Sequence, residues 1–146
     1  MDRGVVVLLT VLAGGLIALQ APINSGLGKA VGTFAAAALL FTVGTVALLG
    51  IAALSGGFGQ LGELRGLAWY YLVGGMLGAI YVTTALVAVR TLGGGGVTAA
   101  TIAGQLTTAV LIDRFGLFGL EQRPLSAGRL LGVGLLAAGT FLVVRE

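Results

Sequence analysis

Two amide side chains near the start of the chain could bind a solute. Gln20 and Asn24 lie four residues apart, so a helix places both amides on one face. Pro22 between them removes a backbone donor and frees a carbonyl nearby. One interpretation is a broken helix end whose amides and free backbone bind a substrate. The other is that the amides join neighbouring helices, or mark the water-exposed end of the helix, and the sequence leaves both open.

A second polar series follows one face of a later helix. Its members are Thr98, Thr101, Gln105 and Thr108. Threonine hydroxyls bind the carbonyl one turn earlier, but a glutamine amide does so less easily. We therefore favour a cavity along this face over a polar contact between helices. Tyr81 could close such a cavity, although a core tyrosine with one hydrogen bond is the ordinary interpretation. Together with Gln20 and Asn24, these residues are the predicted substrate-binding set.

The sequence offers few other groups for chemistry. It has no Cys and no His, which excludes disulfides, thiolate sites and imidazole-based catalysis or metal binding. The run GLGKAVG at residues 26–32 resembles a phosphate-binding loop, but Ala30 stands where Ser or Thr must follow the lysine, and Val31 where the dinucleotide pattern needs Gly. A turn between helices explains this run better. We expect no enzyme, no cofactor and no metal.

The composition places these residues in a membrane. Of 146 residues, 58% are hydrophobic and 9% charged, and the mean hydropathy is +1.10. No charge occurs in the stretches 4–28, 30–62, 66–89 and 91–112. About 20 apolar residues cross a bilayer as a helix, so these stretches predict membrane spans. A soluble enzyme and a disordered chain are excluded, and the net charge of +3 is too small for a nucleic-acid-binding patch.

The charge-free stretches and the polar segments between them predict an all-α membrane protein with five transmembrane helices. These cover approximately residues 4–22, 33–54, 67–89, 95–112 and 126–144 of one domain, 1–146. We expect the first to end near Pro22, and the glycine run at 93–96 to be a turn. Trp69, Tyr70 and Tyr71 suit the headgroup region at the start of the third helix.

Five spans place the two termini on opposite sides of the membrane. The N-terminal side then carries five basic residues: Arg3, Arg65, Arg114, Arg123 and Arg129. The other side carries three: Lys29, Arg90 and Arg145. Orientation follows the Lys/Arg asymmetry, so this difference favours an inside N-terminus only weakly, and insertion in both orientations is a reasonable expectation.

Asp113 is the one acidic residue that could couple transport to a proton gradient. The others are at the termini or in polar connections, whereas Asp113 stands at the end of the fourth predicted helix beside Arg114. A carboxylate there is more often an interface anchor or an ion pair. We therefore predict that the protein is not a carboxylate-gated proton/cation exchanger.

Several segments resemble the YdcZ-type small membrane proteins of the bacterial drug/metabolite transporter superfamily. They are ALQAPINSGL at 18–27, FTVGT at 41–45, AGQL at 103–106 and IDRFG at 112–116. The resemblance implies a multi-pass protein of the bacterial inner membrane, with five helices that equal one half of a ten-helix inverted-repeat bundle. A lone half should pair with an inverted copy. The leading hypothesis is a small-solute transporter that works by alternating access as an antiparallel homodimer. The alternative is a non-transporting scaffold, assembly partner or lipid-handling subunit.

Overall fold

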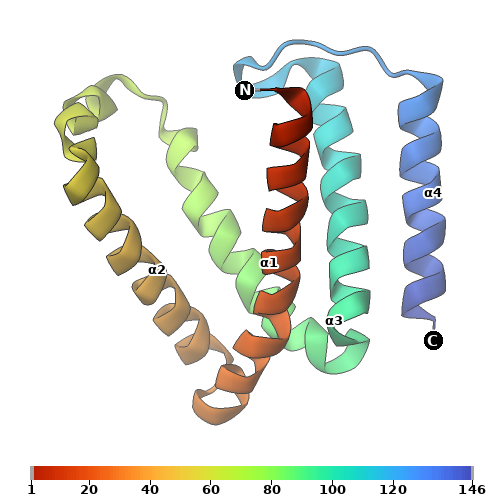
Figure 1. Cartoon of the computed structure of the whole chain (residues 1–146), viewed down its shortest axis with the longest axis horizontal. Coiled ribbons are helices and arrows are strands. Elements are labelled where there is room, and N and C mark those ends of the chain that lie inside the picture. Colours follow the sequence, from red (N-terminus) through yellow and green to blue (C-terminus); the bar gives the residue numbers. More distant parts are fainter. Residues whose placement is uncertain (1, 146) are drawn as a thin grey trace. The chain divides into compact units, whose positions relative to one another are not determined.

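The protein is helical throughout its described part. In the computed structural model, the described residues are 2–145, without the side chains of residues 60 and 63–65. The elements in chain order are α1 (Arg3–Val31), α2 (Thr33–Ser55), η1 (Gly57–Gly66), η2 (Trp69–Leu72), α3 (Val73–Phe115), η3 (Leu117–Gly119) and α4 (Ala127–Val144) (Figure 1).

Four helical stretches among the described residues are long and apolar enough to cross a membrane. They are Arg3–Val31, Thr33–Ser55, Trp69–Phe115 and Ala127–Val144. Most of their large apolar side chains are exposed, which suits contact with lipid. The prediction of an all-helical membrane protein is confirmed. The five predicted spans do not appear as five separate helices.

Most of the third predicted helix, 67–89, and all of the fourth, 95–112, fall within the single element α3. Gly93 interrupts this element with φ 66° and ψ 173°. A side chain at this φ would be strained, so a glycine is needed where the helix breaks. The predicted start at residue 67 is also wrong, because the short 3₁₀ helix η2 precedes α3, which begins at Val73.

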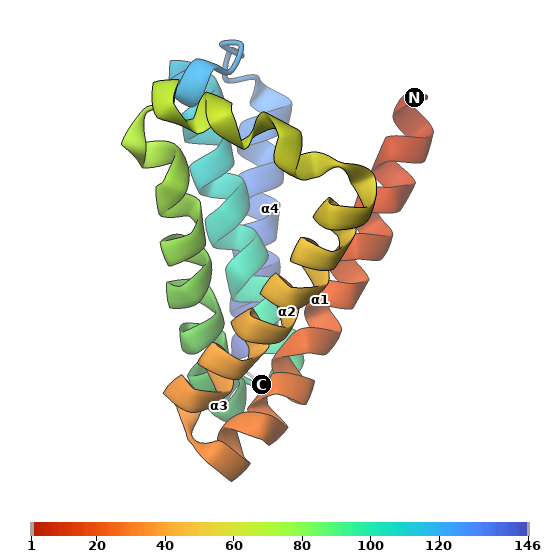
Figure 2. The same ribbon diagram turned by 90° about the vertical axis from the view of Figure 1, so that its left-hand side faces the viewer.

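The predicted end of the first helix near Pro22 is wrong. The helix α1 continues through Pro22 to Val31. Its buried residues beyond the proline are Ser25 and Gly28, which share a helical face with the buried Ala21 just before it. Packing along this face outweighs the hydrogen bond that a proline costs. The chain then turns at Gly32, which has φ 88°, and enters α2 (Figure 2).

The chain divides into two compact units, each of which contains part of α1 and part of α3. Unit 1 consists of residues 2–19 and 91–145, and unit 2 of Gln20–Arg90. In unit 1, the hydroxyl of Thr140 on α4 donates a hydrogen bond to the carbonyl of Ala99 on α3 over 3.0 Å. This bond ties the two helices together across 41 residues of sequence.

Unit 2 is packed around Leu86 of α3. This side chain is 1% exposed and contacts the buried Ala36 and Ala37 of α2. Gly28 of α1 lies so close that a Cβ atom there would stand 3.3 Å from Leu86 Cδ2 and 3.1 Å from a terminal nitrogen of Arg90. Small residues thus let α1 and α2 close on the first part of α3.

Candidate functional site: two grooves

The predicted amide pair lines a groove in unit 2. The groove has a volume of about 340 Å³, and its lining residues are Gln20, Asn24, Leu40, Phe41, Gly44, Thr45, Leu48 and Val82. The continuous helix through Pro22 places both amides on one side, and α2 faces them with Phe41, Gly44 and Thr45. These three α2 residues belong to one of the segments that carried the family resemblance.

The two amides are free to bind a solute. Asn24 is half-buried and Gln20 exposed, and neither side chain has a hydrogen-bond partner within residues 2–145. Each amide offers both donors and an acceptor, and Thr45 adds a hydroxyl. No charged side chain lines this groove. Its chemistry suits a small neutral solute that is held by hydrogen bonds and covered by apolar side chains.

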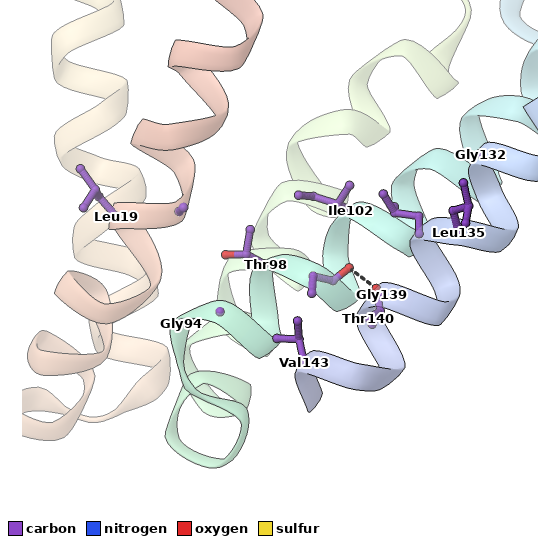
Figure 3. A pocket seen from close by; sticks show the side chains of 13 residues that line it. Leu19, Gly94, Thr98, Ile102, Gly132, Leu135, Gly139, Thr140 and Val143 are labelled. Carbon is purple, nitrogen blue, oxygen red and sulfur yellow. Dashed lines mark hydrogen bonds between the residues drawn. The ribbon is translucent and has the colours of Figure 1, made fainter. Parts of the chain in front are cut away.

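Unit 1 contains a second, larger groove of about 880 Å³ (Figure 3). Of the predicted polar series, only Thr98 lines it. The other lining residues are Ala18 and Leu19 of α1, Gly94, Gly95, Ala99 and Ile102 of α3, and Gly132, Leu135, Leu136, Gly139, Thr140 and Val143 of α4.

The contribution of α4 to this groove was not predicted. Its signal was present in the sequence, because residues 132, 135, 136, 139, 140 and 143 recur every three or four positions and so form one helical face. Glycines and leucines at that spacing are equally typical of lipid contact or of close packing between helices. Only the fold shows that this face lines a groove.

Four of the predicted substrate-binding residues line neither groove. Tyr81 and Thr101 are half-buried, whereas Gln105 and Thr108 are exposed. The groove of unit 1 ends at Ile102 along α3, so Gln105 and Thr108 lie beyond it by up to two turns, whereas Thr101 lies beside Ile102 but outside the lining. The structure therefore divides the predicted set: three residues line the two grooves, two are half-buried outside them, and two are exposed on α3.

Asp113 forms an ion pair, and its partner is Arg129 rather than the adjacent Arg114. The carboxylate lies 3.3 Å from a terminal nitrogen of Arg129, in the first turn of α4. The backbone carbonyl of Asp113 also accepts a hydrogen bond from the backbone nitrogen of Arg123 over 2.9 Å. Asp113 thus fastens the end of α3 to the start of α4, and it lines neither groove.

The described residues include no group of three or more acidic side chains that could hold a metal ion. The polar side chains that line the two grooves are amides and threonine hydroxyls. Such groups can hold and orient a neutral solute by hydrogen bonds.

Long apolar helices that border solute-sized grooves are the features of an integral membrane protein. A family model described as "Putative inner membrane exporter, YdcZ" matches residues 5–142. The chain therefore belongs to the YdcZ family, as the resemblance predicted, and it is a protein of the inner membrane. The family's description is that of a transporter, not of an enzyme.

One relative is the inner membrane protein YdcZ of Escherichia coli K12. The two sequences are 31% identical over 90 residues, which cover 62% of this chain and 58% of that protein. The match thus spans less than two thirds of the relative's length. No solved structure matches the chain.

Proposed function

We propose that the protein exports a small solute across the inner membrane, by alternating access in an antiparallel homodimer. The observation that carries this proposal is the pair of unpartnered amides, Gln20 and Asn24, that face one groove in unit 2. The family description, an inner membrane exporter, supports the direction of transport.

An odd number of crossings supports the antiparallel arrangement. The segments of α3 on either side of Gly93, 73–92 and 94–115, each contain about 20 residues, which is the length of one crossing. Adding α1, α2 and α4, we infer five crossings for each chain. An inverted second copy would complete a ten-helix bundle, and the weak Lys/Arg asymmetry permits both insertions.

The exposed polar residues of α3 suit a contact with the second copy. Gln105 and Thr108 have no hydrogen-bond partner within the described chain. An amide that faces hydrocarbon is expensive, so we assign Gln105 to the interface between copies. Thr101 and Tyr81 stay in the proposed substrate-binding set because they are half-buried.

The same exposed amide favours a second candidate function. If Gln105 docks on another membrane protein, the chain is a scaffold or assembly partner that moves no solute. A transporter must in addition open its grooves to water. A measurement of solute flux distinguishes the transporter from the scaffold.

The test of export is flux in proteoliposomes. A thermal-shift screen of metabolites and cations first finds a solute that stabilises the purified protein. We expect this solute to cross faster than in protein-free liposomes, at the same rate with and without an imposed pH gradient. Asp113→Asn should leave the rate unchanged, because Asp113 is paired with Arg129 and lines neither groove.

Two results would contradict this account. Uphill movement that the gradient drives, and that is lost in Asp113→Asn, would make Asp113 the coupling residue. Flux equal to that of protein-free liposomes would favour the scaffold. The thermal melting curve of the Asp113→Asn protein serves as the control for folding, since the substitution leaves Arg129 without its partner.

A further inference from the structure

The larger groove, in unit 1, is lined without a single charge. Its thirteen lining residues are glycine, alanine, leucine, isoleucine, valine and two threonines. An ion that is buried here would lose its hydration shell and would meet no opposite charge to compensate for the loss. The groove therefore offers no opposite charge to a cation or an anion, and its volume of about 880 Å³ is in the range of sites for drug-sized molecules.

The two hydroxyls of this groove differ in what they can offer to a ligand. Thr140 already donates to the carbonyl of Ala99. Thr98 makes no hydrogen bond among the described residues, although a threonine in a helix commonly donates to the carbonyl four positions earlier. Four other threonines of the spans do so here over 2.8 Å: Thr10, Thr42, Thr84 and Thr107.

Thr98 is also placed to meet a ligand. It is half-buried, and its oxygen points to the side of the groove on which Leu19 lies (Figure 3). A neutral hydroxyl there provides one donor at the edge of an apolar surface.

The glycines of the groove leave room for a ligand. A Cβ atom added at Gly94, Gly132 or Gly139 would meet nothing within 4 Å. The space beside these backbones is therefore not filled by the protein's own side chains, and a larger residue at Gly132 or Gly139 would project into the groove without a clash at Cβ.

We propose that this groove binds neutral, mainly apolar molecules that carry one hydrogen-bond acceptor. The apolar body lies against the face of α4 that contains Gly132, Leu135 and Gly139, and the acceptor receives the hydroxyl proton of Thr98. The site is separate in its residues from the amide groove, and the proposal does not depend on export. A lipid acyl chain would also fill apolar space, but it has no acceptor at its buried end for Thr98.

Three probes of similar shape and different charge test the proposal. They are triphenylphosphine oxide, which is neutral with one acceptor oxygen, the cation tetraphenylphosphonium and the anion tetraphenylborate. Equilibrium binding of each radiolabelled probe is measured on the full chain in phosphatidylcholine nanodiscs, with empty nanodiscs subtracted. We expect saturable binding of the oxide, and at least about tenfold weaker binding of both ions.

Three variants locate the bound oxide. Gly139→Leu fills the groove and should weaken binding at least about tenfold, whereas Gly134→Leu, on the same helix but outside the lining, should leave it unchanged. Thr98→Val keeps the shape and removes the donor, so we expect about a 2- to 10-fold loss.

The proposal is overturned if the cation or the anion binds as tightly as the oxide. It is also overturned if Gly139→Leu and Gly134→Leu behave alike, or if the oxide only partitions into protein-containing discs as it does into empty ones. The last result would mean that lipid chains occupy the groove. Each variant's thermal melting curve shows whether it is folded, and no transport is needed for the measurement.

Discussion

Replacing Gln20 and Asn24 together by leucine is expected to weaken binding of the exported solute about 5- to 150-fold. The estimate is the loss of two hydrogen bonds of about 0.5–1.5 kcal/mol each. The chain itself should stay folded, because neither amide has a partner within the described residues that the change would leave unsatisfied. Binding is measured through the thermal shift that the solute produces, and folding through the melting curve without solute.

Gln105→Leu is the matched comparison, since it makes the same kind of change outside both grooves. We expect it to weaken the dimer in detergent, measured by cross-linking, and to leave solute binding by the remaining dimer intact. The opposite pattern, in which the dimer dissociates when Gln20 and Asn24 are replaced, would show that these amides join helices and do not bind solute.

A single charge is expected to move the orientation of the chain in the membrane. Five crossings would place five basic residues on one side and three on the other, so we expect the two insertions to differ little in free energy. Removing one positive charge, worth about 1 kcal/mol near the surface, should change their ratio about fivefold. Arg114→Ala should bring the two populations closer together, and Lys29→Ala should favour an inside N-terminus.

A C-terminal topology reporter measures the two populations in cells. Arg114→Lys is the control, because it keeps the charge and should keep the ratio. A reporter that stays wholly on one side through both alanine substitutions would contradict dual insertion, and with it the antiparallel dimer.

The sequence predicts the helices well because their signal is local. Long charge-free stretches identify the spans, and α4 (Ala127–Val144) agrees within one residue with the predicted helix 126–144 at both ends. The amide pair could also be predicted from the sequence, because a spacing of four residues places Gln20 and Asn24 on one face of a helix. Their opposite wall, which includes Phe41 and Thr45, was not predicted because it depends on how α2 packs against α1.

The features that were missed depend on contacts between distant parts of the chain. Pro22 predicted a helix end, but α1 continues to Val31, and Ser25 and Gly28 in this continuation are buried by packing. The partner of Asp113 is sixteen residues away, at Arg129, because the segment between α3 and α4 folds back to bring them together. The polar series of α3 does follow one face of the helix, but only Thr98 of this series lines a groove.

The amide groove of unit 2 is expected to open to water and to bind the exported solute. The protein has no native cysteine, so Thr45→Cys places one thiol in this groove. We expect a membrane-impermeant maleimide to label Thr45→Cys in native membranes, and added solute to slow the labelling. Thr42→Cys, one turn earlier on α2 and outside the lining, should stay unlabelled. Absence of labelling at Thr45→Cys from either side of the membrane would contradict this expectation and favour a scaffold.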